Sequence, residues 1–453
     1  MEMLLSEIAK EVAGDLYGRD LAISAASIDT RTLAKADLYI AIKGANFDGH
    51  SFIDKAELAG ASAVLVEHKC DTELSQIVVE DAHLALAELA GAWKNQAKVK
   101  TVAVTGSNGK TTVKEMIAAI LNVNASVWFT QGNFNNDIGV PLTLLKLQQE
   151  HEFAVIEMGA NHSGEIAYSS RYAQADVAVI TNVGAAHIEG FGSLEGVAKA
   201  KGEIISGLSN HGVAILNRDD EFYDVWTEIA DNRKIISFGV HESADVRAKE
   251  IKPKVEGGEF ASQFVLSTAA GEIVIKLGLA GQHNVINALA AAASCLALGI
   301  ELQQIKQGLE KIKPVVGRLQ PLVGKKGNLI IDDTYNANPS SVKAALDVLM
   351  QCEGEPWFVM GALAELGIDS VKEHQQLGEL IKSKNVAQLL TIGSDAESTS
   401  HSFGRGATFF DSQAELIAYL ETELKGDEAV LIKGSRSQKM ERIVEAIVTD
   451  YRT

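Results

Sequence analysis

A glycine-rich segment in the first third of the chain contains the residue types that hold a polyphosphate. Residues 105–112 read Thr-Gly-Ser-Asn-Gly-Lys-Thr-Thr and directly follow the apolar run 101–104. A buried strand that breaks into a glycine turn and opens a helix surrounds phosphates with backbone N–H groups. In such a loop Lys110 reaches the β- and γ-phosphates, and the Thr111 hydroxyl binds Mg²⁺. We therefore predict a nucleoside triphosphate site formed by Gly106, Ser107, Asn108, Gly109, Lys110, Thr111 and Thr112.

This loop differs from the usual phosphate-binding motif in its length. The pattern G-x-x-x-x-G-K-[ST] would place a glycine at position 104, where this chain has Val104, and the first glycine comes two residues later. We interpret the segment as a shortened variant. A glycine turn that merely joins a strand to a helix is the alternative, although Gly-Lys-Thr-Thr in this context has few other uses.

Two polar residues stand just beyond later strands, where a ligand crevice is expected. Glu157 ends the apolar run 153–156, and His187 follows the apolar run 177–181 through a short loop. Ligands of parallel sheets bind at the carboxyl ends of the strands, and a carboxylate there can hold the Mg²⁺ that bridges the phosphates. The alternatives are a local hydrogen bond for the carboxylate and a structural role for the histidine.

A helical segment over residues 192–204 is expected to line the same crevice. It carries Lys199 and Lys201, which are two positions apart and so point to different faces of a helix. At most one of these lysines can face the site, and the pattern alone does not say which.

Composition restricts the classes of partner and compartment. The 453 residues suggest about three domains, and the net charge of −19 argues against nucleic acid, which is bound by clustered Lys and Arg. The cysteines Cys70, Cys295 and Cys352 are far apart, which indicates neither a disulfide framework nor a zinc site. The sequence has no apolar run long enough to cross a bilayer, and its first residues lack the basic start of a secretion signal. We therefore expect a cytosolic protein that does not insert into a membrane.

The chain divides into three stretches with different patterns, expected as domains at 1–97, 98–313 and 314–453. The first has short strands, as at 37–42 and 63–66, separated by polar, glycine-containing segments that are either solvated turns or part of a small binding domain. The second alternates short apolar runs with helical stretches, which is typical of a parallel sheet covered on both faces. Its residues 245–280 alternate in polarity and predict an antiparallel edge.

The third stretch repeats the alternation of strands and helices after a linker that we expect at Pro314, Gly317 and Pro321. Apolar runs over 328–332, 357–360, 389–392 and 429–432 predict a Rossmann-like, doubly wound α/β domain. No G-x-G-x-x-G occurs in it, so a nicotinamide cofactor is not supported.

Taken together, the motifs resemble those of the ATP-dependent Mur ligases, which build the stem peptide of peptidoglycan. The resemblance runs from about residue 27 to about residue 444, with the motifs in the expected order. It is carried by the phosphate loop, 157–159, 181–183 with His187, 200–201, 281–288 and 332–339. It implies a three-domain architecture in which a small α/β domain, a central ATPase domain and a Rossmann-like domain follow one another.

The resemblance also implies site residues in each domain. The first domain would bind uridine diphosphate through Asp29, Thr30 and Arg31, where the family usually has Asp-Ser-Arg. Asn284 and Asn287 would lie near the adenine, and Arg318, Asp332, Tyr335 and Asn336 would reach the nucleotide from the last domain. Lys201 matches the lysine that takes up CO₂ as a carbamate and, with His187, binds a second Mg²⁺. The first Mg²⁺ would lie on Thr111 and Glu157.

Two segments narrow the resemblance to one branch of the family. The segments 132–142 and 433–441 are similar to those of the member whose incoming amine is D-alanyl-D-alanine, and they imply substrate contacts from Asn133, Asn135, Asn136, Lys433 and Arg436. Relatives that add a single amino acid, including the folylpolyglutamate type, are the alternative within the family. The expected activity is ATP-dependent amide bond formation through an acyl phosphate on small-molecule substrates, by a chain expected to be a monomer.

Other functional classes remain open from the sequence. A phosphate-loop switch or transport ATPase would hydrolyse ATP without an acceptor, whereas a ligase requires a UDP-sugar peptide and an amine. A nucleotide-binding scaffold without catalysis is difficult to reconcile with the presence of Glu157, His187 and Lys201 together.

Overall fold

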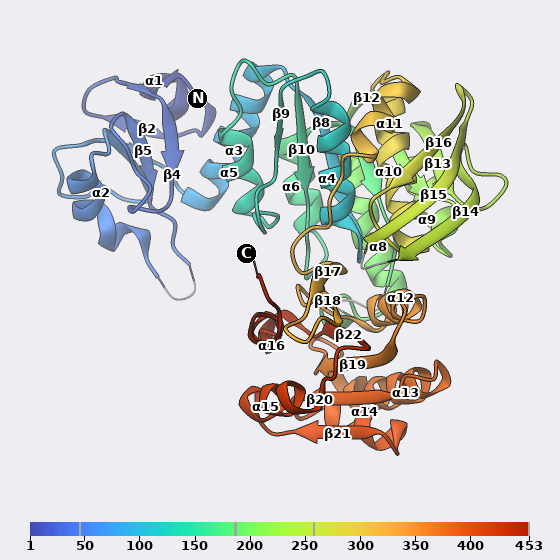
Figure 1. Ribbon diagram of the computed structural model, residues 1–453. Coiled ribbons are helices and arrows are strands. Elements are labelled where there is room, and N and C mark those ends of the chain that lie inside the picture. The colour runs from blue at the N-terminus through green and yellow to red at the C-terminus, as the bar shows by residue number, and fades with distance from the viewer. Residues whose placement is uncertain (45–46, 185–187, 257–258, 452–453) are drawn as a thin grey trace.

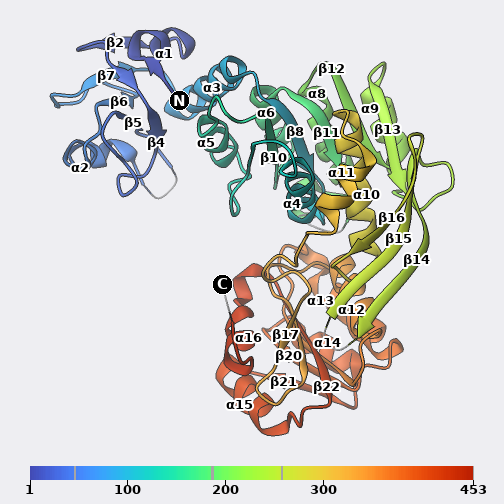
Figure 2. The ribbon, with the colours of Figure 1, turned by 45° about the horizontal axis from the view of Figure 1, so that its top comes forward.

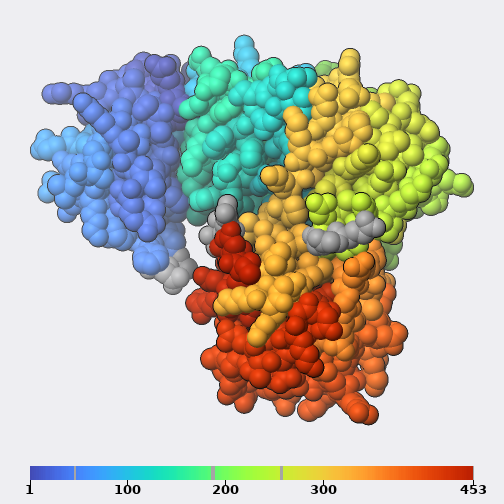
Figure 3. Space-filling view, viewed as in Figure 1, coloured from blue at the N-terminus to red at the C-terminus, as the bar shows by residue number. Residues whose placement is uncertain are grey.

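The computed structural model describes residues 1–44, 47–184, 188–256 and 259–451. Figure 1 shows an N-terminal part beside a central part, with a C-terminal part below the central one. In the space-filling view of Figure 3 the surface is hollowed between the N-terminal and C-terminal parts. Successive stretches of the chain therefore form separate layered units around a shared space.

The N-terminal part is a small mixed sheet with the strand order β2-β7-β6-β5-β4, in which β4 to β7 are parallel and β2 is antiparallel to β7. Its strands are β2 (Asp15–Tyr17), β4 (Ala25–Ser27), β5 (Asp37–Ile40), β6 (Ala63–Val66) and β7 (Ser75–Val78). The remaining elements are the pair β1 (Met3–Leu4) and β3 (Ala22–Ile23), with α1 (Leu5–Glu11), η1 (Gly49–Phe52) and α2 (Ile53–Ala59).

Helix α3 (Ala82–Ala97) connects this part to the centre. Asp81 caps its first turn by accepting hydrogen bonds from the N–H groups of His83 and Leu84. The helix packs against α1 and also against central helices α5 (Gly139–Leu145) and α6 (Glu165–Ala173). Because α3 packs against both the N-terminal and the central part, its packing does not decide the domain boundary expected at 97/98. The boundaries at 97/98 and 313/314 both stay predictions.

The central sheet has the order β16-β15-β14-β13-β12-β11-β8-β10-β9. Its strands are β8 (Lys100–Thr105), β9 (Val127–Phe129), β10 (Phe153–Glu157), β11 (Ala175–Ile180), β12 (Leu208–Asn217), β13 (Lys234–Gly239), β14 (Val246–Glu256), β15 (Glu259–Thr268) and β16 (Gly271–Leu277). The run from β9 to β14 is parallel, and β14, β15 and β16 are antiparallel, as the sequence predicted.

Helices cover both faces of this sheet, which explains the continuous apolar runs of its inner strands. One face packs on α4 (Lys110–Leu121), α10 (Gln282–Ala297) and α11 (Leu302–Leu309). The other packs on α5, α6, α8 (Leu194–Ser206) and α9 (Tyr223–Ala230), with the short α7 (Ile188–Phe191) beside α8.

The C-terminal part is a doubly wound sheet with the order β17-β18-β22-β19-β20-β21. Its strands are β17 (Gln320–Val323), β18 (Leu329–Asp333), β19 (Glu355–Gly361), β20 (Gln388–Ile392), β21 (Ala407–Phe410) and β22 (Glu428–Lys433). One face carries α12 (Pro339–Leu349), α13 (Ser370–Ser383) and α14 (Ala396–Phe403), and the other carries α15 (Gln413–Glu423) and α16 (Glu441–Ile447). The short turns η2 (Gly367–Asp369) and η3 (Arg436–Gln438) precede α13 and α16.

The Rossmann-like arrangement predicted for this part is confirmed, with differences at its margins. Pro321 lies in the antiparallel edge strand β17 rather than in a linker. An edge strand tolerates proline, because a missing N–H on its outer side costs the sheet no hydrogen bond. Strand β21 was not anticipated. The last helix, α16, begins at Glu441, after the η3 turn.

An antiparallel ribbon links the central sheet to the C-terminal part. In Figure 2 strands β14 and β15 extend from the central sheet towards α12 and α14. Near the tip of this ribbon, Phe260 is buried in the same apolar cluster as Ile331, Leu346 and Phe358 of the C-terminal part. The two parts are therefore joined by packing as well as by the chain.

Within the described ranges, no helix is both long and apolar enough to span a membrane.

Candidate active site

A cleft of about 1170 Å³ lies between the central and C-terminal parts. The phosphate loop, Glu157 and the start of α10 line it from the central part, and the segment after β18 and the end of β22 line it from the C-terminal part. These are carboxyl ends of strands in both sheets, where ligands of α/β proteins bind. The structure therefore brings most of the predicted residues into one site.

The glycines of the phosphate loop are required by close contacts. Gly106 has φ +145°, and a Cβ there would lie 1.9 Å from Thr181 Oγ1. Gly109 has φ +82°, and a Cβ there would lie 2.4 Å from Asn287 Oδ1. A side chain at either position would therefore displace the loop from the end of β11 or from α10.

Lys110 and Thr111 open helix α4 at the floor of the cleft. The Lys110 ammonium donates to the carbonyl oxygens of Gly106 at 2.7 Å and Ser107 at 3.4 Å. Burial lowers the pKa of Lys110, the charge of Glu157 raises it and that of Arg318 lowers it. The Thr111 hydroxyl accepts a hydrogen bond from Arg318 Nη2 at 2.9 Å. The loop thus holds one cation and touches a second from the segment that leads into β17.

Arg318 is fixed between the two parts of the molecule. Its guanidinium carbon lies 4.2 Å from the centroid of the Tyr335 ring, a cation–π distance. Its Nε is buried and makes no hydrogen bond to any residue that the structure describes. A buried guanidinium N–H group without an acceptor, next to the phosphate loop, suits an anionic ligand.

Glu157 has a carboxylate oxygen available for a cation. The residue is 2% exposed, and its Oε1 accepts a hydrogen bond from Asn135 Nδ2 at 2.8 Å. Its Oε2 is buried without a hydrogen-bond partner among the described residues. Buried polar atoms are normally paired, so this oxygen together with the Thr111 hydroxyl fits the predicted Mg²⁺ position. His187, predicted for the second position, lies outside the described residues.

The structure distinguishes the two lysines of α8. Lys199 is exposed and pairs with Glu195 at 2.7 Å. Lys201 is 2% exposed, with its ammonium 5.4 Å from the centroid of the Phe191 ring, and, contrary to the expectation for 192–204, no residue of α8 lines the cleft. Burial lowers the pKa of Lys201 to about 7, and the positive charge of Lys110 acts in the same direction. An uncharged amine at this position therefore needs no metal ion to depress the pKa.

The asparagine segment before α5 has several structural roles. Asn135 holds Glu157, and Asn136 Oδ1 accepts a hydrogen bond from the N–H of Gly139 at the start of α5. Asn133 lines the cleft and is exposed. Next to this segment, Asp137 pairs with His83 of α3 at 2.9 Å.

At the end of β18 the neighbouring aspartates have different environments. Asp332 is fully buried and accepts hydrogen bonds from Thr334 and from the Tyr451 hydroxyl, and it does not line the cleft. Asp333 lines the cleft and pairs with Lys433 at 2.6 Å. Successive side chains of a strand point to opposite faces, so the alternation along β18 is the signal that could have favoured Asp333. Tyr335 and Asn336 line the cleft as predicted.

Asn284 and Asn287 lie on the first turns of α10, beneath the phosphate loop. Asn284 donates to the carbonyl oxygen of Ala280 at 2.8 Å, and Asn287 donates to Asn284 Oδ1 at 3.3 Å. Their neighbour His283 also lines the cleft, although the sequence analysis did not select it. Burial lowers the pKa of His283 to about 4, so its imidazole is neutral at pH 7.

Residues from the C-terminal part bind the phosphate loop directly. Asn338 Nδ2 donates to Asn108 Oδ1 at 2.8 Å, and Asn108 Nδ2 donates to the Ser340 hydroxyl at 3.0 Å. Asn338 also caps α12 by accepting from the N–H of Ser341. Sequence reasoning missed Asn338 and Ser340 as site residues, because pairing across 230 positions leaves no local pattern.

The predicted uridine-binding residues lie in the N-terminal part and do not line the cleft. Arg31 donates to both carboxylate oxygens of Asp29, with the shortest distance 2.6 Å, and these hydrogen bonds lower the pKa of Asp29 to about 2. Thr30 lies between them. The structure therefore places these residues together, but apart from the phosphate loop.

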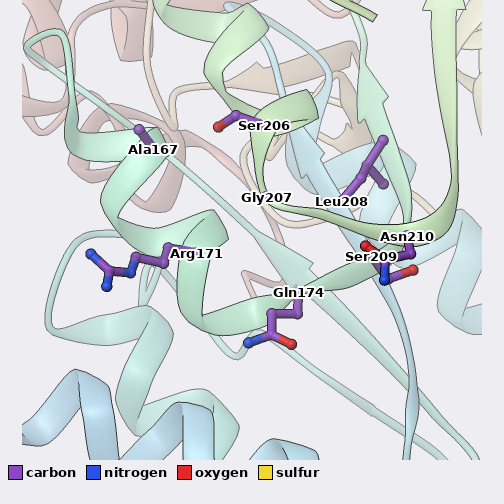
Figure 4. Close-up of a pocket in the computed structure, with 8 residues that line it drawn as sticks. All are labelled: Ala167, Arg171, Gln174, Ser206, Gly207, Leu208, Ser209 and Asn210. Carbon is purple, nitrogen blue, oxygen red and sulfur yellow. The ribbon is translucent and has the colours of Figure 1, made fainter. Parts of the chain in front are cut away.

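A smaller cavity of about 560 Å³ lies at the other end of the central part. Figure 4 shows it between the end of α6 and the segment that joins α8 to β12. Ala167, Arg171 and Gln174 border it on one side, and residues 206–210 on the other. No predicted site residue lines it, so the cleft at the phosphate loop remains the candidate active site.

Comparison with known proteins assigns this site to a class. The family model "Mur ligase middle domain" matches residues 104–295, "Mur ligase, glutamate ligase domain" matches 317–436, and "Mur ligase family, catalytic domain" matches 22–105. The chain belongs to the Mur ligase family.

Among its relatives, the UDP-N-acetylmuramoyl-tripeptide--D-alanyl-D-alanine ligase of Escherichia coli K12 is 42% identical over 99% of this chain and 98% of its own. A crystal structure of MurF from Acinetobacter baumannii, 38% identical, superposes with a TM-score of 0.93 and covers 98% of both chains. MurF ligase from Thermotoga maritima in complex with ADP is 31% identical, with a TM-score of 0.83 over 93% of this chain and 96% of its own.

Proposed function

We propose that this chain is an ATP-dependent ligase that joins D-alanyl-D-alanine to UDP-N-acetylmuramoyl-tripeptide, giving the pentapeptide precursor of peptidoglycan. The observation that carries the proposal is the shared cleft, with a phosphate loop on one side and charged strand ends on the other. Relatives named as this ligase also support the proposal, because their sequences align with nearly the full length of this chain. A structure of UDP-N-acetylmuramoyl-L-alanyl-D-glutamate--2,6-diaminopimelate ligase is 18% identical to this chain, and one of folylpolyglutamate synthase is 15% identical. At this level of identity the similarity shows only a shared fold.

The chemistry follows from the needs of an amide bond. A carboxylate is a poor acyl donor, and transfer of the γ-phosphoryl of ATP gives it a good leaving group. The loop N–H groups and Lys110 hold the phosphates and neutralise the charge that develops during transfer, so no protein nucleophile is needed. Contacts between the C-terminal part and the loop, through Asn108 and Arg318, close the site against water before the amine attacks.

Metal binding is part of the proposal. Thr111 and the free oxygen of Glu157 are the residues that would hold the first Mg²⁺. When bound there, Mg²⁺ would neutralise charge on the phosphates. For the second position we propose Lys201 and His187. The uncharged Lys201 amine would add to CO₂ with loss of one proton, and the resulting carbamate oxygens would be metal ligands.

The remaining residues are assigned by their position. Asn284, Asn287 and Tyr335 border the space for the nucleoside, and Asp29, Thr30 and Arg31 are proposed for the uridine diphosphate. One chain supplies both sides of the cleft, which favours a monomer as the active unit. The proposed substrates, ATP and a nucleotide sugar, are metabolites of the cytosol, which favours that location.

Release of inorganic phosphate from ATP tests the proposed function. We expect release only when a UDP-N-acetylmuramoyl-tripeptide and D-alanyl-D-alanine are both present. Candidate tripeptides with different third residues would be assayed with and without the dipeptide. Phosphate release without any acceptor would indicate a switch or transport ATPase, and a preference for a single amino acid would indicate the alternative ligase activity.

A further inference from the structure

A charge pair on the C-terminal side of the cleft is formed by Arg436 and Glu441. Arg436 Nη1 donates to Glu441 Oε1 at 3.1 Å, and both residues line the cleft. The side chain of Arg436 is 62% exposed and that of Glu441 is 26% exposed. The backbone N–H of Arg436 also approaches Asn336 Oδ1 at 3.4 Å, which ties η3 to the segment after β18. Both charges are therefore held at the wall of the site, where the Arg436 side chain is largely exposed and the Glu441 side chain is partly exposed.

Lys433 differs from Arg436 in its availability. It is 2% exposed, and its ammonium donates to Asp333 Oδ2 at 2.6 Å and to the carbonyl oxygen of Asn336 at 2.9 Å. A buried ammonium that is neutralised by a carboxylate and hydrogen-bonded to a carbonyl has little capacity left for a substrate. The cation that this strand end offers to the cleft is consequently Arg436.

Glu441 has hydrogen-bonding capacity that the protein leaves unused. One oxygen accepts from Arg436, whereas Oε2 is buried and makes no hydrogen bond within the described part of the chain. A carboxylate oxygen without a donor is unfavourable, because desolvation is not compensated. A cationic group in the cleft would satisfy this carboxylate.

We infer that Arg436 and Glu441 recognise D-alanyl-D-alanine as a zwitterion, with Arg436 binding its carboxylate and Glu441 binding its ammonium group. This inference rests on the proposed function and adds Glu441 as a specificity-determining residue. A ligand with only one of the two charges makes only one of the two contacts, which is how such a pair discriminates.

The inference concerns binding rather than the rate of attack. The ammonium must lose its proton before its nitrogen can attack the acyl phosphate. Removing the Glu441 charge should therefore raise the KM for the dipeptide much more than it lowers kcat.

Steady-state kinetics of Glu441→Gln test this assignment. Glutamine keeps an oxygen that can accept from Arg436 but has no charge. We expect the KM for D-alanyl-D-alanine to rise about tenfold or more, with the KM for ATP unchanged, because a charge-assisted hydrogen bond is lost. Glu445→Gln is the matched control, since Glu445 is exposed on the same helix and does not line the cleft. An unchanged dipeptide KM in Glu441→Gln would overturn the inference.

An analogue without the ammonium separates direct contact from support of Arg436. Propionyl-D-alanine, a competitive inhibitor in this design, should bind Glu441→Gln as well as it binds the wild type. Equal weakening of dipeptide and analogue would instead mean that Glu441 acts only through Arg436. Glu441→Asp provides a second variant with the charge retained, and it should keep the preference for the dipeptide over the analogue. If the wild type shows no dipeptide-dependent phosphate release, the proposed function is wrong. An active wild type together with an unchanged dipeptide KM in Glu441→Gln would contradict only the role of Glu441.

Discussion

The central and C-terminal sheets both present the carboxyl ends of parallel strands to the cleft, but they present different chemistry there. At the end of β8 the binding groups are mainly backbone N–H groups, placed by Gly106 and Gly109. At the ends of β18 and β22 they are side-chain charges in pairs, Asp333 with Lys433 and Arg436 with Glu441.

This difference has a physical basis in what each side must recognise. A polyphosphate is highly charged and is held well by many N–H donors, which come from the backbone and do not depend on side-chain identity. An amine with a carboxylate needs charges of both signs, which only side chains provide. We therefore propose that substitution at the end of β22 changes the amine that is accepted without disturbing the nucleotide site proposed at β8.

The largest expected effect is on the backbone side of the comparison. Lys110→Ala should reduce kcat by about 10²–10³-fold, because loss of one preorganised electrostatic contact costs about 2.7–4 kcal/mol in the transition state. The melting temperature should stay close to that of the wild type. Retention of more than about a tenth of the wild-type rate would show that this loop is not the phosphate site.

Lys201 should have the next largest effect. Lys201→Ala should lose about 100-fold in activity and recover part of it when a short carboxylate such as formate is added, since formate can replace the carbamate oxygens. Lys199→Ala, on the exposed face of the same helix, is the control and should retain activity. No response either to CO₂ depletion or to added carboxylates would contradict the carbamate.

The lowered pKa of Lys201 also predicts a dependence of stability on pH. In the folded protein this pKa is about 7, against 10.5 in the unfolded chain. Between these values the unfolded chain binds a proton that the folded chain does not, so the contribution of Lys201 to the free energy of unfolding rises with pH. In CO₂-free buffer, Lys201→Met should therefore stabilise most below pH 7, and its advantage should shrink towards pH 10. A difference that does not vary with pH would contradict the lowered pKa.

On the side-chain side of the comparison, Arg436→Ala should act on the amine substrate alone. We expect the KM for D-alanyl-D-alanine to rise about 10–100-fold, because the guanidinium fork that binds a carboxylate is lost. The KM for ATP should change less than threefold by the same reasoning. Equal increases in both KM values would place Arg436 at the phosphates and remove the distinction between the two strand ends.

The smallest expected effect concerns the contact between the two sides. Ser340→Ala removes the acceptor for Asn108 Nδ2 and should lower kcat about two- to twelvefold, as expected for one hydrogen bond of about 0.5–1.5 kcal/mol. Ser383→Ala, at the exposed end of α13, is the control. A loss as large as that of Lys110→Ala would mean that the two sides act as one unit.

The sequence predicted those parts of the site that are contiguous in the chain. The phosphate loop, Glu157 and the strands before them have local patterns, because each strand is a continuous apolar run that ends in polar residues. The alternation of polar and apolar residues over 245–280 also predicted the antiparallel edge of the sheet. The helix pattern alone did not choose Lys201 over Lys199. The family resemblance favoured Lys201, and the packing of α8 shows that Lys201 is on the buried face.

Other parts required three-dimensional information. Whether Asp332 or Asp333 lines the cleft depends on which face of β18 borders it. Lys433 is paired with Asp333, which lies 100 positions earlier in the chain. The contacts of Asn108 with Asn338 and Ser340 join segments more than 200 positions apart. Such pairs leave no periodicity, so no reading of a single sequence could have supplied them.

The ribbon formed by β14 and β15 limits how the C-terminal part can move. A domain held by its chain alone could swivel about a single point in any direction. Here a second attachment exists, because Phe260 near the ribbon tip is packed into the core beside Ile331 and Leu346. A body held at two points turns about the line that joins them, as a door turns on its pins. The ribbon thus restricts the directions in which the charged strand ends can move relative to the phosphate loop.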